Sequence, residues 1–322
     1  MRTHLAIVLS TSLGLGVVGA NGNAVSPTTL FVDVEPGVKI EVLDYGGSGR
    51  TVVLVPGYGR AAHDFDSFGP ALTAAGFHAY AVSRRGFGAS SRPPAGYSAD
   101  RLADDVLAVM DSLRLARPIL AGHSLGGQEL SSIGSRFPKR VTALVYLDAA
   151  YGYAFFDEAD AENRYFVDKN EVLRGLQQMT DALETGNAED AHRMIARLLA
   201  TDLPALRETL EGLDKRVPET SPNPRRSLTM RLRPGVDRMV FDGLQRYTAV
   251  TAPVLAIFAL KGMSSGAELE AWRSGTRHEV RALKRAAPQA EVLILPNAPH
   301  DVFRSNDAEV IASIRSLVAK LP

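Results

Sequence analysis

The sequence Gly122-His123-Ser124-Leu125-Gly126-Gly127 stands between a predicted strand and a predicted helix. It follows the apolar run Pro118–Ala121 directly, and it precedes a stretch with helical periodicity that continues to Arg136 and stops at Phe137-Pro138. The pattern Gly-x-Ser-x-Gly in this setting predicts a sharp turn, because side chains two positions to either side of the serine would collide there. Ser124 is therefore expected to project from the top of a sheet, at the N-terminus of a helix.

Short, almost entirely apolar runs recur on both sides of this turn, and stretches with helical stripes separate them. Such runs are typical of a parallel sheet whose two faces are covered by helices. The stripes over Leu102–Leu113 and Val310–Val318 predict two of those helices. The alternation predicts an α/β protein with a mostly parallel central sheet. The predicted strands are Val52–Val55, Ala79–Val82, Pro118–Ala121, Ala143–Leu147, Val254–Phe258 and Val292–Leu295.

The strand signals stop between residues 151 and 251. A helical stripe from Met194 to Leu199 lies in this stretch, and four prolines between Pro218 and Pro234 break up its end. The strand and helix pattern resumes at Pro253, so the sheet is expected to be completed after an insertion. We predict a core formed by residues 25–150 and 252–322, and a helical cap or lid formed by residues 151–251 at the C-terminal edge of the sheet.

Composition excludes several classes of chemistry. The 322 residues include 36 Lys+Arg, 36 Asp+Glu and no cysteine, so disulfides, thiolate zinc sites, iron–sulfur clusters and cysteine nucleophiles are ruled out. The balanced charge argues against nucleic acid as a partner, because that binding depends on neutralising phosphates. The sequence also contains neither a His-Glu-x-x-His zinc motif nor a phosphate-binding P-loop motif. We therefore expect no metal and no cofactor, and a small-molecule substrate.

The N-terminus has the features of a signal peptide. Arg2 precedes the apolar stretch Leu5–Val18, whose fourteen residues are fewer than the roughly 20 that cross a bilayer as a helix. Residues 1–24 are therefore predicted to be a leader cleaved after Ala20 or Ala24, which implies a secreted or periplasmic protein without a stable membrane anchor. An uncleaved N-terminal helix is the alternative.

The leader also matches Gly-x-Gly-x-x-Gly at Gly14–Gly19, but no strand precedes this match, so no dinucleotide is inferred.

Beyond the serine turn, two further motifs resemble the α/β-hydrolase superfamily, in its serine esterase and lipase-like branch with a helical lid. Val55-Pro56-Gly57-Tyr58-Gly59 follows the first strong strand, where the superfamily usually has His-Gly. Arg84–Ser90 is similar to the superfamily's Asp-x-Arg-Gly-x-Gly-x-Ser turn, with Ser83 where Asp is common. The resemblance covers nearly the whole chain after the leader. It implies the α/β-hydrolase fold, with a helical cap inserted after the sixth-strand region, and an oxyanion hole formed by the backbone N–H groups of Tyr58 and Leu125.

A serine nucleophile needs a base within hydrogen-bond reach and a third group that fixes the tautomer of that base. Of the seven histidines, His300 follows the strand Val292–Leu295 through a short loop and precedes the final helix. Its position resembles that of the superfamily's catalytic histidine loop, so it is the predicted base. A surface-loop histidine without a catalytic role is the alternative reading, and His63, near the Tyr58 loop, is the reserve candidate.

The acid of the predicted triad is less directly indicated. The superfamily usually places it after the strand that precedes the histidine loop, but no carboxylate follows Leu260 before Glu268. Asp148 directly follows the neighbouring strand, an alternative location in some branches of the superfamily. The order Ser124, Asp148, His300 matches the order of nucleophile, acid and histidine in this fold. We therefore predict Asp148 as the acid, with Glu268 or Glu270 as alternatives.

These residues predict an exported serine hydrolase, most simply a carboxylic-ester hydrolase that acts through an acyl-enzyme. Because the turn carries Ser124 in place of Asp, the haloalkane dehalogenase and epoxide hydrolase chemistries of the same superfamily are disfavoured. A C–C bond hydrolase, a lactonase or amidase, and a perhydrolase on the same fold remain alternatives. From a different class, a binding protein with a hydrolase shell and weak turnover also fits. The sequence leaves the oligomeric state open.

Overall fold

The structure is a computed structural model, and the chain divides into two compact units. One unit comprises residues 1–156 and 234–322, and the other comprises residues 157–233. The structure describes residues 26–150, 154–155, 188–204, 249–260, 276–277 and 279–321, together with the single positions 207, 236, 239, 240, 243, 245 and 247.

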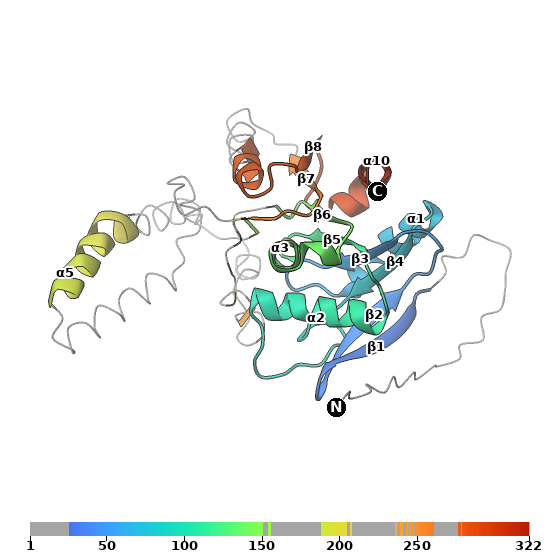
Figure 1. Cartoon of the computed structure of the whole chain (residues 1–322), viewed down its shortest axis with the longest axis horizontal. Helices are drawn as coiled ribbons and strands as arrows, with labels where there is room; N and C mark the ends of the chain where they lie inside the picture. Colours follow the sequence, from blue (N-terminus) through green and yellow to red (C-terminus); the bar gives the residue numbers. More distant parts are fainter. Residues whose placement is uncertain are drawn as a thin grey trace, which may run out of the picture. The chain divides into compact units, whose positions relative to one another are not determined.

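The first unit contains an eight-stranded sheet with the order β1-β2-β4-β3-β5-β6-β7-β8 (Figure 1). Strand β2 pairs antiparallel with β1 and with β4, and all the other pairs are parallel. This confirms the predicted α/β-hydrolase fold with a mostly parallel central sheet. The strands are β1 (Thr28–Glu35), β2 (Val38–Asp44), β3 (Thr51–Val55), β4 (His78–Val82), β5 (Ile119–His123), β6 (Ala143–Leu147), β7 (Val254–Leu260) and β8 (Glu291–Pro296).

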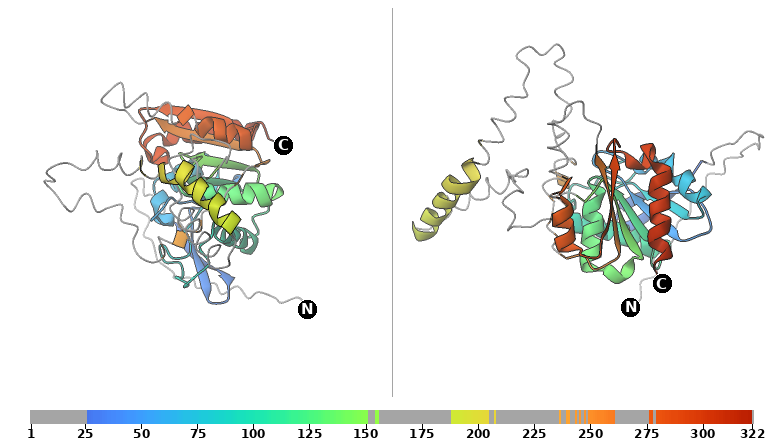
Figure 2. Two further views of the ribbon diagram at one scale, coloured as in Figure 1. Left: turned by 90° about the vertical axis from the view of Figure 1, so that its left-hand side faces the viewer. Right: turned by 90° about the horizontal axis from the view of Figure 1, so that it is seen from above.

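The central strands are almost entirely apolar because helices cover both faces of the sheet (Figure 2). Successive side chains of a strand point to opposite faces, so Val53 and Leu120 join one buried cluster and Val52 and Ala121 join the other. Helices α2 (Ala99–Ser112) and α3 (Gly126–Arg136) contribute to the first cluster. Helices α1 (Phe68–Ala74), α9 (Val302–Ser305) and α10 (Asp307–Ala319) contribute to the second. Two short 3₁₀ helices, η1 (Ala62–Phe65) and η2 (Pro138–Arg140), lie in connecting segments.

The antiparallel edge of the sheet differs from the sequence expectation. The apolar runs predict no strand before Val52, whereas β1 and β2 pair from Thr28↔Asp44 to Glu35↔Val38. Strand β1 is an edge strand, and seven of its eight residues are partly or fully exposed to solvent, so Val32 alone is buried. Four of its eight residues, Thr28, Thr29, Asp33 and Glu35, are polar, so the continuous apolar signal of a central strand is missing.

The described part of the second unit contains helix α5 (Ala188–Arg197) followed by a π-helical turn, η4 (Leu198–Asp202). The helical stripe predicted from Met194 to Leu199 falls within these two elements. The rest of the predicted cap in this unit, and the predicted leader, lie largely or wholly outside the described residues. Among the helices that the structure describes, none is both long enough and apolar enough to cross a membrane.

Candidate active site

Ser124 occupies a strained turn between β5 and α3. Its φ is 48°, in the left-handed region that residues other than glycine rarely adopt. Two backbone hydrogen bonds hold the turn: the Ser124 N–H donates to the carbonyl of Leu147 at 3.3 Å, and the Ser124 carbonyl accepts from the Gly127 N–H at 2.9 Å. The side chain is half-buried. Strain of this kind persists when the surrounding structure enforces it, and it is a common feature of active sites.

Two glycines make this turn sterically possible. A Cβ atom at Gly122 would lie 2.7 Å from the carbonyl oxygen of Gly126, and a Cβ atom at Gly126 would lie 2.6 Å from the carbonyl oxygen of Val55. Both distances are far shorter than a van der Waals contact, so a larger residue at either position would displace backbone. The turn is therefore packed tightly against the C-terminal end of β3.

His300 and Asp148 are in direct contact although 152 positions separate them in the sequence. The Nδ1 atom of His300 lies 2.6 Å from Oδ2 of Asp148. The other carboxylate oxygen, Oδ1, accepts a hydrogen bond from the Ala259 N–H at 2.8 Å, and the Asp148 side chain is only 3% exposed. An ionised carboxylate only accepts hydrogen bonds, so the contact places the proton of a neutral His300 on Nδ1 and leaves Nε2 as the unprotonated ring nitrogen.

The loop after β3 runs against the serine turn. A Cβ atom at Gly57 would come within 2.9 Å of His123 Nδ1 and within 3.2 Å of Ser124 Cβ. The side chains of Tyr58 and Leu125 pack in one apolar cluster, so the two predicted oxyanion residues are anchored together. The other members of that cluster are Phe87, Tyr97, Leu102, Val236, Met239 and Val240.

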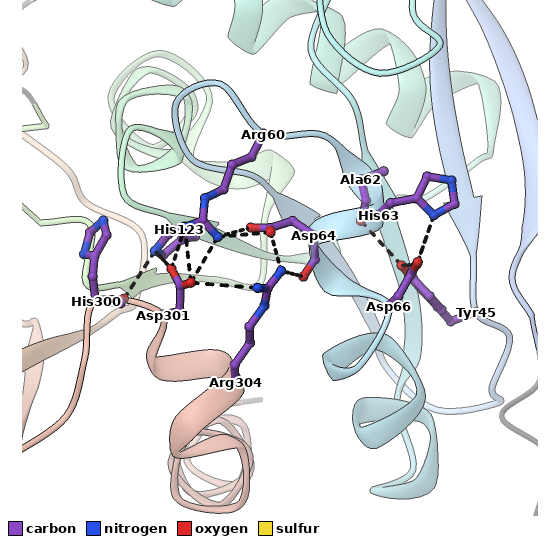
Figure 3. Close-up of polar contacts among 10 residues, drawn as sticks. All are labelled: Tyr45, Arg60, Ala62, His63, Asp64, Asp66, His123, His300, Asp301 and Arg304. Carbon is purple, nitrogen blue, oxygen red and sulfur yellow. Dashed lines mark hydrogen bonds and ion pairs between the residues drawn. The ribbon is translucent and has the colours of Figure 1, made fainter. Parts of the chain in front are cut away.

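His123, which precedes Ser124, supports the loop that carries His300 (Figure 3). Its ring is 1% exposed and lies 4.6 Å from the His300 ring, and its Nε2 atom lies 3.2 Å from the His300 carbonyl oxygen and 3.4 Å from Oδ1 of Asp301. Burial, with a further contribution from the nearby His300, lowers the pKa of His123 to about 3. A neutral imidazole has one N–H group, and both acceptors face Nε2, so we place that proton on Nε2. The sequence identified His123 only as the variable residue of the serine motif.

Ion pairs tie the segment after Tyr58 to the segment after His300 (Figure 3). Arg60 pairs with Asp64 at 2.9 Å and with Asp301 at 3.0 Å, and Arg304 pairs with Asp64. Burial lowers the pKa of Arg60, but hydrogen bonds from its guanidinium to the two carboxylates outweigh this effect and raise it. His63, the reserve candidate for the base, instead pairs with Asp66 at 2.9 Å, with 57% of its side chain exposed.

A second carboxyl group lies near Asp148. Glu279 is partly buried, and burial together with the charge of Asp148 raises its pKa to about 8.

The alternative acids Glu268 and Glu270 lie outside the described residues. Within the ranges that the structure describes, no group of three or more His, Cys, Asp or Glu side chains is arranged to hold a metal ion.

An eight-stranded, mostly parallel sheet with a serine turn at the C-terminal end of a central strand is the architecture of an α/β hydrolase. A model of the alpha/beta hydrolase family matches residues 52–313, so the chain belongs to this family.

Relatives within the family include several kinds of hydrolase. Epoxide hydrolase A of Mycobacterium tuberculosis is 33% identical over 125 residues, which cover 38% of each chain. The 2-(acetamidomethylene)succinate hydrolase of Mesorhizobium japonicum is 25% identical over 217 residues, or 57% of this chain and 77% of that relative. The first curated relatives are matched over less than half of their own length. These relatives support a hydrolase function.

A solved structure extends the likeness to the whole fold. An esterase from Exiguobacterium antarcticum aligns with a TM-score of 0.56 and 18% identity, and the alignment covers 91% of this chain and all of that one. At this level of identity, the likeness shows the shared fold alone.

Proposed function

We propose that the protein is a serine hydrolase that cleaves carboxylic esters through an acyl-enzyme. The observation that carries the proposal is the 2.6 Å contact between His300 Nδ1 and the buried carboxylate of Asp148. This contact leaves Nε2 of His300 as the basic nitrogen, on the loop that also contacts the residue before Ser124. The residues thus supply a nucleophile, a base and a group that orients the base, as serine hydrolysis requires.

In the proposed mechanism, Nε2 of His300 takes the proton of the Ser124 hydroxyl as Oγ attacks the ester carbonyl carbon. The carbonyl oxygen becomes an oxyanion, which the backbone N–H groups of Leu125 and Tyr58 stabilise. His300 then returns the proton to the leaving alcohol, and an acyl ester remains on Ser124. Water, deprotonated by His300, then attacks the acyl carbon, the bond to Ser124 Oγ breaks, and His300 returns the proton to Oγ as the carboxylic acid leaves. Asp148 holds the imidazole in orientation and stabilises its charged form throughout.

The residue at position 124 also bears on the likeness to epoxide hydrolases. Ring opening by a covalent enzyme route in this superfamily uses a carboxylate nucleophile, whereas the turn of this chain presents an alcohol. An alcohol activated by a histidine is suited to attack on an acyl carbon. We therefore assign the chain to acyl transfer. Lactones, amides, C–C bonds next to a carbonyl and perhydrolysis are the substrate and reaction classes to compare with simple esters.

The proposal is tested with wild-type protein and Ser124→Ala, assayed on a short-chain aryl ester and labelled with a fluorophosphonate. We expect wild type to hydrolyse the ester and to take up the label at Ser124. Ser124→Ala should lose both, with a rate lower by about a million-fold or to the background of the assay. Turnover at the wild-type rate by Ser124→Ala would refute the assignment of the nucleophile. A wild-type chain that neither turns over nor takes up the label would instead identify a hydrolase-like binding protein.

A further inference from the structure

Arg84 joins the loop after β3 to the helix that follows Ser124. It lies after β4, and its side chain is 3% exposed. One terminal nitrogen, Nη1, donates to the carbonyl of Gly57 at 2.8 Å, and Nη2 donates to the carbonyl of Pro56. The Nε atom pairs with the carboxylate of Glu129 on α3, whose side chain is 1% exposed. One buried guanidinium therefore binds three groups from two elements that border the serine turn.

The carbonyl of Gly57 belongs to the same peptide group as the Tyr58 N–H. In a trans peptide the C=O and the following N–H share a plane and point in opposite directions, and the described chain contains no cis peptide. A donor that fixes the Gly57 oxygen therefore fixes the direction of the Tyr58 N–H as well. A cationic donor on the oxygen also polarises the amide, which strengthens its N–H as a hydrogen-bond donor.

The two proposed oxyanion donors are supported in different ways. The Leu125 N–H shares a peptide group with the Ser124 carbonyl, which accepts from the Gly127 N–H at 2.9 Å in the first turn of α3. For Tyr58, the comparable backbone bond, from the Arg60 N–H to the Gly57 carbonyl, is stretched to 3.4 Å. At that length it is a weak hydrogen bond, so the shorter, charge-assisted bond from Arg84 is the main support of the Tyr58 peptide.

The ion pair between Glu129 and Arg84 is not explained by its contribution to the stability of the folded protein. Both side chains are buried, and one carboxylate oxygen of Glu129 has no hydrogen-bond partner within the described residues. Removing two charges from water offsets most of their attraction, and apolar residues of similar volume often stabilise such a site equally well. The planar, forked guanidinium can, however, reach two carbonyls and a carboxylate at once, which an apolar side chain cannot do.

We propose that Arg84, held by Glu129, is a positioning residue that orients the Tyr58 N–H as an oxyanion donor. This inference rests on the proposed function, because an oxyanion forms only if the site performs acyl transfer. Arg84 acts through the Gly57–Tyr58 peptide and does not contact the substrate. It should therefore affect the transition state, in which the oxyanion exists, and leave the binding of the ground-state ester nearly unchanged.

The test compares two double variants. In each of them, apolar side chains replace both members of a buried ion pair. Arg84→Met with Glu129→Leu removes the clamp without leaving an unpaired buried charge. Arg85→Met with Asp105→Leu is the matched control, because the guanidinium of Arg85 is equally buried and binds Asp105 at 2.6 Å and 2.7 Å but has no contact with the Pro56–Tyr58 loop among those described. Both double variants are assayed for kcat and KM on the aryl ester. Inhibition by a trifluoromethyl ketone, which forms a tetrahedral oxyanion adduct with a serine, is measured in parallel.

We expect the Arg84/Glu129 variant to lose about 10- to 100-fold in kcat, less than the full loss of an oxyanion donor, with KM within about twofold of wild type. Its affinity for the trifluoromethyl ketone should fall by the same factor. The Arg85/Asp105 control should keep kcat within about twofold, whatever its melting temperature. Arg84→Lys retains the charge without the fork, and it should show the same pattern with a smaller loss, so it serves as the test if the double variant does not fold.

An unchanged kcat in the folded Arg84/Glu129 variant, or in Arg84→Lys, would overturn the proposal. Equal losses in the Arg84/Glu129 variant and the control would also overturn it, because a general loosening of the core would then explain both. The Ser124→Ala variant separates the two levels of inference. Activity that depends on Ser124 but not on Arg84 refutes only the positioning role, whereas activity that persists in Ser124→Ala refutes the proposed function itself.

Discussion

The two carboxylate oxygens of Asp148 have different partners, and this asymmetry makes Asp148→Asn an informative substitution. The Oδ1 atom must still accept from the Ala259 N–H, so the new amide nitrogen would face His300 Nδ1. That amide can only donate, which forces the His300 proton onto Nε2 and blocks the base. We expect kcat for ester hydrolysis to fall by about 10⁴-fold with little change in KM. Because asparagine tolerates the positive φ of 48° at this position, the fold should persist, and circular dichroism checks it.

Glu268→Gln and Glu270→Gln are the matched controls for Asp148→Asn, since the sequence leaves both residues open as alternative acids. We expect each of them to retain kcat within about twofold of wild type. A loss near 10⁴-fold in either control, combined with an active Asp148→Asn, would transfer the role of the acid away from Asp148.

Glu279 makes the stability of the protein depend on pH. Because burial and the charge of Asp148 raise its pKa to about 8, the folded protein binds this proton more tightly than the unfolded chain, whose value is near 4.5. Its stabilising contribution is therefore complete below pH 4.5 and is lost as the pH rises towards 8. Glu279→Gln cannot ionise, so we expect equal melting temperatures at pH 4.5 and a higher one for the variant at pH 9, by about 2 to 6 °C.

The exposed Glu309 provides the comparison for Glu279. Glu309→Gln should change the melting temperature by the same small amount at pH 4.5 and at pH 9. If Glu279→Gln behaved like Glu309→Gln, the carboxyl of Glu279 would not be held in its neutral form by the fold.

At the scale of residues, the sequence predicted the groups whose chemistry has a local signature. Ser124 has its glycine motif, and Asp148 and His300 each follow a strand; the structure brings the last two into contact. No local pattern could indicate that His123 donates to the His300 carbonyl, because 177 positions separate the two residues. Arg84 has only a faint signal in the sequence: two arginines follow a buried strand after a single serine, where each charge needs a partner.

Among the elements, Asp100 connects α2 with α3 and with the segment before β7. Its Oδ1 atom accepts from the hydroxyls of Ser132 at 2.6 Å and Tyr247 at 2.7 Å, and its Oδ2 atom accepts from the amide of Gln245 at 3.0 Å. Burial raises the pKa of Asp100, but these hydrogen bonds and the charge of Arg136 outweigh burial and lower it below 3.8. The stabilisation is therefore present above pH 3.8 and is lost as the pH falls through the folded-state pKa.

We expect Asp100→Asn to lower the free energy of unfolding by about 1 kcal/mol at pH 7, a value reduced for the partial exposure of this carboxylate. The difference from wild type should shrink as the pH falls below 3.8, and urea denaturation at several pH values measures it. Asp104→Asn is the control, because the Asp104 side chain is 40% exposed and, among the described residues, pairs with Arg136. Equal effects of the two substitutions would show that the hydrogen bonds to Asp100 add nothing beyond surface charge.

The elements that the sequence predicted are those whose burial is uniform. Five of the six predicted strands fall within observed strands, and the sixth, Pro118–Ala121, overlaps β5 from Ile119 onward. The helix after Ser124 ends at Arg136 as predicted. The hairpin β1–β2 went unpredicted because most of β1 is exposed and because β2 buries a carboxyl group. Glu41 of β2 is 4% exposed, and it accepts a hydrogen bond from the Ser83 hydroxyl at 2.6 Å. This partnership forms only when β2 lies beside β4, so no local pattern of residues could reveal it.

For the whole molecule, the candidate site depends on two distant parts of the chain. Ser124 and Asp148 precede residues 157–233, which form the second unit, and His300 follows them. The parallel pairing of β6 with β7 and of β7 with β8 joins the two parts of the first unit in one sheet. Because Ala259 of β7 also binds Asp148, assembly of the sheet and assembly of the Asp148–His300 pair are the same event. The reactivity of Ser124 should therefore disappear in the same denaturant range as the structure of the sheet.

The leader is predicted to contribute to transport and not to the fold. The described sheet begins at Thr28, where Thr28↔Asp44 is the first pair of β1 with β2, so cleavage after Ala20 or after Ala24 would leave every described strand complete. We expect a chain that begins at Val25 to match the full chain in kcat, and in melting temperature to within about 2 °C, because it retains every described strand. When the full gene is expressed in a bacterium, the intact mass of the exported product should lack residues 1–20 or 1–24. A full-length mass in the cytoplasmic fraction would contradict export, and unfolding of the chain that begins at Val25 would show that the leader belongs to the folded protein.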